Sequence, residues 1–203
     1  RRPPELVRFL SAHQWLRGRR IAVVVAYEQP WLITHLTLRL KRFVPDFHPI
    51  IFDNSPSASA RAAISQACAD GGVSYFALPE NPIRNINRSH GNALNWVYRN
   101  VLLALEPELF VLLDHDIFPR AECDLAARLG DQPFYGHKMD WGFGWALWAG
   151  YSVFRLAAIR AARPDFNPDM DRNLVTGGRN QARLYRHHDS ATLRFASYEQ
   201  RHI

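Results

Sequence analysis

The chain has 203 residues, of which 47% are hydrophobic and 22% charged, so it can bury a substantial core. Its net charge of +6 suits an anionic partner, but no zinc-finger, RNA-recognition or basic-zipper pattern accompanies it, and we expect no nucleic-acid partner. No apolar run approaches the roughly 18 residues that cross a bilayer. Cys68 and Cys123 stand alone, which favours a reduced, cytoplasmic protein without disulfides. Because the chain starts with arginine, we expect a fragment or a processed form.

Strand-like and helix-like segments alternate along the chain. Short apolar runs predict strands, and apolar residues spaced by three and four predict helices. In chain order, the predicted elements are a helix at 5–17, a strand at 21–26, a helix from 29 to 45, a strand at 49–52, a helix at 59–70, a strand at 73–78, a helix at 91–105, a strand at 109–113 and a helix at 156–162. This alternation predicts an α/β fold with a mainly parallel, doubly wound sheet.

Aromatic side chains are concentrated in residues 134–154. We interpret this stretch and the polar, basic tail after it as a second half that completes the sheet and supplies a lid or an acceptor pocket. Trp141, Trp145 and Trp148 would form a stacking platform for a ligand bound in that pocket. The alternative is that these tryptophans belong to the strand core.

Polar residues follow each predicted parallel strand, in segments 27–30, 53–56, 79–91 and 114–119. Ligands of doubly wound sheets bind outside the carboxyl ends of the strands. The four loops are therefore predicted to form one site.

The strongest single signal is Leu-Phe-Val-Leu-Leu-Asp-His-Asp at 109–116. Residues two apart in an extended chain face the same way, so Asp114 and Asp116 would repel each other without a cation. Hard divalent cations take carboxylate oxygens and keep positions for substrate phosphates. We predict a metal site that meets a phosphorylated ligand, with solvated or capping carboxylates as the alternative. His115, facing the other way, would be a packed histidine.

The four loops resemble those of nucleotide-sugar glycosyltransferases with the GT-A fold, specifically glycosyltransferase family 2. The motifs that carry the resemblance are Val23-Val24-Val25-Ala26-Tyr27-Glu28, Ile50-Ile51-Phe52-Asp53-Asn54-Ser55, the spacing of Asn81, Arg88 and Gly91, and Asp114-His115-Asp116. They cover about residues 20–120. The departures from the family are Ala26 and Glu28 for threonine and asparagine, Ile83 for glycine, Ser89 for asparagine, and no plain Glu-Asp base motif in the second half.

The resemblance implies one GT-A, Rossmann-like domain over residues 1–203, with a mainly parallel central sheet flanked by helices. Residues 20–120 would bind the nucleotide sugar and metal, and 121–203 would form the smaller acceptor-side half. The implied activity is that of a metal-dependent, inverting hexosyltransferase. It would use Mn²⁺ or Mg²⁺ and a UDP- or GDP-sugar, with a glycan, lipid-linked or small-molecule acceptor. The basic amino-terminal helix would lie on the inner face of an anionic membrane or, alternatively, pack on its own domain.

The resemblance also implies roles for single residues. The nucleotide sugar would meet Ala26, Tyr27, Glu28, Asp53, Asn54, Arg84, Arg88, Asp114 and His115, and the metal would bind Asp114 and Asp116. Asp53 would accept a hydrogen bond from the base, with an Asx turn as the alternative. Tyr27 would stack on the base or cover the sheet edge. Arg88 would meet the diphosphate or Asp114, or form a surface ion pair.

An inverting transfer needs a carboxylate that deprotonates the acceptor hydroxyl. The family carries this base in its second half, which makes Asp171 the first candidate, Asp169 the second and Asp140 the third. Each could instead be an ordinary loop carboxylate. His187 and His188 are weaker candidates, for a third metal ligand.

Other functions are also compatible with a carboxylate pair after a buried strand. Haloacid-dehalogenase-like phosphatases place such a motif on their first strand, whereas three predicted strands precede it here. Sugar nucleotidyltransferases wrap phosphates with a glycine-rich first loop, which Tyr27-Glu28-Gln29-Pro30 is not. A non-catalytic nucleotide- or carbohydrate-binding domain remains a third alternative.

Overall fold

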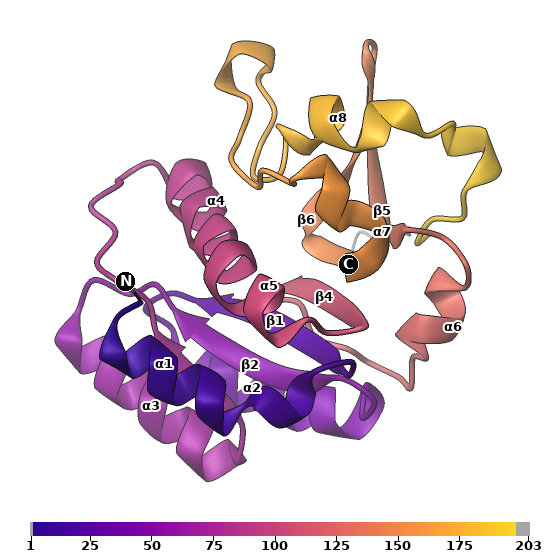
Figure 1. Ribbon diagram of the computed structural model, residues 1–203. Helices are drawn as coiled ribbons and strands as arrows, with labels where there is room; N and C mark the ends of the chain where they lie inside the picture. The colour runs from indigo at the N-terminus through magenta and orange to yellow at the C-terminus, as the bar shows by residue number, and fades with distance from the viewer. Residues whose placement is uncertain (1, 198–203) are drawn as a thin grey trace, which may run out of the picture.

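A six-stranded sheet runs through the molecule, with helices on both faces (Figure 1). The structure is a computed structural model that describes residues 2–197. The strands are β1 (Arg20–Ala26), β2 (His48–Asp53), β3 (Ser74–Ala77), β4 (Leu109–Asp114), β5 (Phe134–Trp141) and β6 (Gly144–Arg155), in the spatial order β3-β2-β1-β4-β6-β5. β1 to β4 are parallel, and β6 is antiparallel to both its neighbours. The predicted α/β fold with a mainly parallel sheet is confirmed.

Eight α-helices and several single turns connect these strands within residues 2–197. The helices are α1 (Pro4–Ala12), α2 (Pro30–Phe43), α3 (Ala58–Gly71), α4 (Ile86–Val97), α5 (Leu103–Leu105), α6 (Leu125–Leu129), α7 (Leu156–Ile159) and α8 (Asn180–Arg183). A π-helical turn at Tyr98–Leu102 joins α4 to α5, and 3-10 turns lie at Gln14–Leu16, Arg160–Ala162, Met170–Arg172, Tyr185–His187 and Ser190–Thr192. Across these residues, every helix is too short or too polar to span a lipid bilayer.

Two apolar cores lie on opposite faces of the sheet. Odd-numbered residues of β1, such as Val23, face a core shared with α1 and α4. Even-numbered ones, such as Val24, face a core shared with α2 and α3. Parallel strands covered on both faces read as continuous apolar runs, which is why they were visible in the sequence. Leu6 and Phe9 of α1 are buried in the first core, so this helix packs on its own domain.

α4 begins five residues before the helix predicted at 91–105. The side chain of Asn85 accepts the backbone N–H of Arg88 and caps the helix there. Gly91 therefore lies inside the helix and does not start it. A β-carbon at Gly91 would stand 2.6 Å from the carbonyl oxygen of Phe166, so the missing side chain lets the second half approach α4 closely.

β6 reaches beyond the carboxyl edge of the parallel strands. The last pair between β4 and β6 joins Leu113 and Tyr151, so residues 144–150 project past the end of β4 in the β5–β6 hairpin (Figure 1). Between the pairs Gly136–Ser152 and Lys138–Leu147, residues 148–151 of β6 stand opposite a single residue of β5. This bulge sits beside the end of β4, a place where bulges commonly redirect side chains towards a site.

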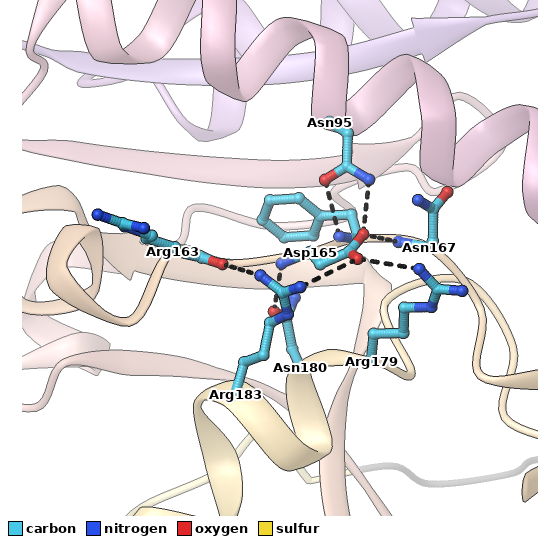
Figure 2. A network of polar contacts seen from close by, with 8 residues as sticks. Asn95, Arg163, Asp165, Asn167, Arg179, Asn180 and Arg183 are labelled. Carbon is cyan, nitrogen blue, oxygen red and sulfur yellow. Dashed lines mark hydrogen bonds and ion pairs between the residues drawn. The ribbon is translucent and has the colours of Figure 1, made fainter.

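A buried carboxylate fastens the segment after β6 to α4 (Figure 2). Asp165 accepts hydrogen bonds from the Asn95 amide (2.8 Å) and from Arg179 (3.3 Å), and its own N–H donates to Asn180 (2.8 Å). The backbone N–H of Phe166 donates to the side-chain carbonyl oxygen of Asn95 at 2.9 Å. Burial opposes ionisation, but hydrogen bonds to the carboxylate from the Asn167 N–H, the Asn95 amide and Arg179 hold the pKa of Asp165 below its ordinary value. The network fixes the segment around Asp165 against α4.

Two histidines share one serine hydroxyl near the amino ends of β2 and β3. His13 Nδ1 lies 2.8 Å from the carbonyl oxygen of Phe9, so that nitrogen is assigned the proton. The Nε2 atoms of His13 and His48 lie 2.7 and 2.9 Å from Ser74 Oγ. Burial, with the nearby His13 and Lys41, lowers the pKa of His48. The two rings therefore tie the end of α1 to β2 and β3.

Candidate active site

The carboxyl ends of β1, β2 and β4 lie at the same level, at one edge of the sheet. Val25 pairs with Phe52 on one side and with Asp114 on the other. A cavity of about 440 Å³ opens at this edge. Of the residues predicted to meet the nucleotide sugar or the metal, the cavity is lined by Tyr27, Asn54, Arg84, Asp114, His115 and Asp116.

Both carboxylates of the Asp-His-Asp segment line this cavity, but not for the predicted reason. β4 ends at Asp114 and the chain then turns, so strand alternation does not extend to Asp116. The expectation that His115 packs away from the site was wrong, because this turn brings His115 onto the cavity wall. Burial raises the pKa of Asp114 to about 6, and the neighbouring Asp116 contributes in the same direction.

The charge of this carboxylate pair suits a hard divalent cation. His90 Nε2 lies 3.7 Å from Asp114 Oδ1. Burial lowers the pKa of His90 to about 4, so this imidazole is neutral near pH 7 and adds no positive charge beside Asp114. Within residues 2–197, no three His, Cys, Asp or Glu side chains are grouped to hold a metal by themselves. A cation here would need further oxygens from a ligand, as Mg²⁺ commonly takes from phosphates.

Gly150, in the bulge of β6, makes room for Asp114. A β-carbon at this position would stand 2.5 and 2.6 Å from two ring carbons of Trp148, and even closer to Asp114 Oδ2. The Trp148 indole and the Asp114 carboxylate thus flank the same small space. The bulge therefore makes one wall of the carboxylate site.

Three polar side chains form a connected floor under the cavity. Asn54 donates to Ser89 Oγ at 3.0 Å and accepts from the Asn81 amide at 3.1 Å. Asn81 also donates to the Ser89 carbonyl at 3.0 Å. Asn54 is 6% exposed. These bonds join the loops after β2 and β3 to α4, so the floor is fixed before any ligand binds.

The loop after β1 is held to the loop after β2. Glu28 has a positive φ of 56°, and its backbone N–H donates to Ser55 Oγ while its carboxylate accepts from the Ser57 N–H. Glu28 thus serves the loop, and Ala26 is fully buried at the end of β1. Tyr27 is 47% exposed on the cavity wall. Of Ala26, Tyr27 and Glu28, which were predicted to meet the nucleotide sugar, only Tyr27 lines the cavity.

Asp53 is fully buried at the end of β2. One carboxylate oxygen accepts the Ser55 N–H at 2.8 Å, and the other accepts the Tyr75 hydroxyl at 3.0 Å. The first bond is the Asx turn that the sequence offered as the alternative. The contact of Asp53 with a nucleobase stays a prediction.

The two arginines predicted to meet phosphate differ in position. Arg84 lines the cavity from the loop after β3. Arg88 is exposed on the first turn of α4 and lies outside the lining. The structure therefore favours Arg84 over Arg88 for contact with a diphosphate.

The three candidate bases lie outside the cavity lining. Asp171 is exposed on the 3-10 turn at Met170–Arg172. Asp169 is partly buried, with Arg172 3.9 Å away, and Asp140 is exposed and paired with Lys138 at 3.1 Å. Their catalytic roles stay predictions.

The three tryptophans of the predicted acceptor platform are in different environments. Trp145 is 8% exposed and packs in the core against Tyr185, which is the alternative that the sequence left open. Trp141 stacks on Phe143 near the tip of the hairpin, with ring centroids 6.2 Å apart. Trp148 is partly exposed beside Gly150 and Asp114. Only Trp148 is brought to the carboxylates.

The histidine pair of the tail lies elsewhere. His188 packs edge-on against Phe134, with ring centroids 5.0 Å apart. His187 is exposed, and neither residue lines the cavity. The suggestion of a third metal ligand from this pair stays a prediction without support from the geometry.

His90 and Gly150 were missed by sequence reasoning. His90 occupies the unspecified position between Ser89 and Gly91 of the third motif, so the only signal was its place inside that motif. Gly150 carried no signal, because its contact with Asp114 depends on the antiparallel register and bulge of β6.

A mainly parallel sheet in the order 3-2-1-4-6-5, with this site at its carboxyl edge, is the GT-A fold. The chain is similar to the mannosyltransferase PcManGT of Pyrobaculum calidifontis, solved with GDP-Man and Mn²⁺, at 16% identity and a TM-score of 0.52. It is also similar to S. aureus TarS, at 16% identity and a TM-score of 0.51. The matches cover 78% and 73% of this chain but only 54% and 30% of those proteins. No protein-family model and no curated protein sequence matches the chain.

Proposed function

We propose that this chain is a metal-dependent glycosyltransferase of the hexosyltransferase type. It would transfer a sugar from a UDP- or GDP-sugar to a glycan, lipid-linked or small-molecule acceptor, with inversion. The observation that carries the proposal is the pair of carboxylates, Asp114 and Asp116, that line one cavity at the carboxyl edge of a GT-A sheet. The similar mannosyltransferase, solved with GDP-Man and Mn²⁺, gives this site a chemical precedent.

The residues of the cavity suit the parts of a nucleotide sugar. The exposed ring of Tyr27 offers a stacking surface for a base, with Asn54 and Asn81 below it. Arg84 offers a guanidinium for phosphate oxygens. Asp116 and Asp114 would hold Mn²⁺ or Mg²⁺ together with the diphosphate. When bound, such a cation supplies charge neutralisation for the leaving nucleoside diphosphate.

An inverting transfer also requires a carboxylate that accepts the proton of the acceptor hydroxyl. The candidates are Asp171, Asp169 and Asp140. Asp169 lies in the segment that Asp165 fastens to α4, and its backbone nitrogen is 3.1 Å from the point where a β-carbon of Gly178 would stand. This packed position favours Asp169 over the exposed Asp171, because a general base must be held in place.

Calorimetric titration of UDP and GDP, each with and without MnCl₂, tests the proposal. We expect metal-dependent binding of at least one diphosphate, and its loss in Asp116→Asn with the fold retained. The matched control is Asp140→Asn, a carboxylate outside the cavity. Equal diphosphate binding by Asp116→Asn and the unaltered chain would refute the metal site.

Two further assays separate the alternative functions. A haloacid-dehalogenase-like phosphatase would release inorganic phosphate from a generic monoester such as p-nitrophenyl phosphate. A non-catalytic binding domain would bind the diphosphate but never hydrolyse or transfer the sugar of the corresponding nucleotide sugar. A glycosyltransferase should instead release the nucleoside diphosphate when the acceptor is supplied, and slowly to water without it.

A further inference from the structure

A second hollow lies on the α2 side of the loop that carries Asp116. It has a volume of about 390 Å³ and is lined by Trp31, His35, Arg39, Phe118 and Arg120. The first three stand four residues apart on α2 and so form one stripe along the helix. Phe118 and Arg120 belong to the chain that follows β4. None of these five residues lines the cavity of Asp114 and Asp116.

The hollow has cationic groups and no acidic ones. Arg39 lines it from α2 and Arg120 from the chain after β4, and its lining contains no aspartate or glutamate. Within the described part of the chain, neither guanidinium lies within 4.0 Å of a carboxylate. Arg39 makes one weak bond, 3.4 Å long, to the Pro119 carbonyl. Two arginines without a counter-ion beside a concave surface suit an anion, and guanidinium groups suit the oxygens of a phosphate.

The same hollow offers an exposed aromatic face. Trp31 is 59% exposed, which is uncommon for so large an apolar side chain. Its indole N–H donates to Gln29 at 2.7 Å, and the edge of His35 meets the ring with centroids 6.2 Å apart. These contacts hold the ring, and more than half of its surface stays exposed. A flat ring of a ligand would stack on the Trp31 indole, and a saturated ring would bury apolar surface against it.

We propose that this hollow is a second binding site, for the phosphate ester of a ring-bearing molecule such as a nucleotide or a phosphosugar. The phosphate would lie between Arg39 and Arg120, and the ring would cover Trp31. This site does not depend on the proposed transferase activity, because it shares no residue with the Asp114 cavity. It is nevertheless adjacent in the chain, since Arg120 lies four residues after Asp116.

The test uses ³¹P NMR titrations of phenyl phosphate, glucose 6-phosphate and inorganic phosphate, in EDTA and at low salt. Removing metal keeps the Asp116 site out of the measurement, and low salt preserves charge attraction. Five variants accompany the unaltered chain, one of which, Arg84→Gln, alters the other cavity. Arg39→Gln and Arg120→Gln remove one guanidinium each, and Trp31→Ala removes the ring surface. Arg42→Gln is the matched control on the same helix.

We expect Arg39→Gln and Arg120→Gln each to weaken binding by about tenfold or more, as losing a charge-assisted hydrogen bond does. Arg42→Gln should leave affinity unchanged. Trp31→Ala should lower the affinity for the ring-bearing probe to that for inorganic phosphate. A preference for phenyl phosphate would point to a nucleotide, and a preference for glucose 6-phosphate to a phosphosugar.

Three results would overturn the proposal. The first is the absence of binding by either ring-bearing probe. The second is equal binding by Arg39→Gln and the unaltered chain. The third is a loss in Arg84→Gln as large as in Arg39→Gln, since that would place the probe in the other cavity. Failure here leaves metal-dependent diphosphate binding untouched, so this proposal and the transferase can fail separately.

Discussion

Replacing Gly150 with alanine should damage the carboxylate site more than the fold. The added β-carbon would stand 2.5 and 2.6 Å from ring carbons of Trp148 and closer still to Asp114 Oδ2. Ordinary contacts of a β-carbon are 3.4–4 Å, so the indole or the carboxylate must move by about 1 Å. Overpacking of this kind costs about 1–3 kcal/mol of stability. Metal–oxygen distances tolerate only about 0.2 Å, so a displaced Asp114 loses its place in a metal site.

Two measurements check this expectation. Urea denaturation should show a free energy of unfolding lowered by about 1–3 kcal/mol, with the m-value unchanged. Calorimetry with MnCl₂ and the preferred nucleoside diphosphate should show binding weakened by about tenfold or more. Gly142→Ala is the matched control, because no atom lies within 4 Å of a β-carbon there. If Gly150→Ala matches the control in both measurements, the wall that we describe between Trp148 and Asp114 does not constrain the site.

Three more predictions concern the base, the chemistry and the pH dependence. Asp53→Asn keeps an acceptor for the Ser55 N–H but replaces the second carboxylate oxygen, the one left for a nucleobase imide, with an amide nitrogen that only donates, so it should weaken uridine or guanosine binding by about 1–3 kcal/mol; unchanged nucleoside affinity would leave Asp53 as a turn residue alone. Asparagine variants of Asp169, Asp171 and Asp140 should include one that spares donor binding and slows turnover by roughly two to four orders of magnitude. If all three turn over normally, the inverting assignment fails. The folded chain holds the pKa of His48 below the ordinary 6.5, so the unfolded chain binds more protons and the free energy of unfolding should fall as the pH drops below about 6.5. Denaturation of His48→Gln should show a shallower pH slope, with the remainder due to His90 and His188, whose pKa values are also lowered; an equal pH slope in the variant would refute it.

The nucleotide half of the fold was readable because its signals are local. A parallel strand covered on both faces is a continuous apolar run, and the run before Asp114 shows where the strand ends. The polar residue after such a run must lie at the carboxyl edge. Asp53, Asp114 and Asp116 were therefore placed at the correct edge from sequence alone. The α4 boundary was less accessible, because Gly91 looks like a helix start while serving a contact with Phe166, 75 residues away.

The acceptor side could not be read in the same way. Trp145 and Trp148 belong to the same aromatic-rich stretch of the sequence, yet Trp145 lies in the core and Trp148 lies beside Asp114. The bulge at 148–151 separates them, and a bulge depends on pairing with another strand. His90 meets Asp114 only when α4 packs on β4. Such contacts form only in the tertiary structure, so no local sequence pattern predicts them.

The position of β6 between β4 and β5 has a consequence for how the protein is made. A ribosome releases β5 before β6, yet β5 can join the sheet only through β6. The outer edge of β4 therefore stays unpaired until residue 155 has emerged, and an unpaired edge invites pairing with other chains. Trp148 and Gly150 arrive with that last strand. We expect that in the nascent chain β1 to β4 are already folded while the outer edge of β4 is still unpaired. A chain truncated before residue 144 should therefore aggregate more readily than one truncated after residue 183.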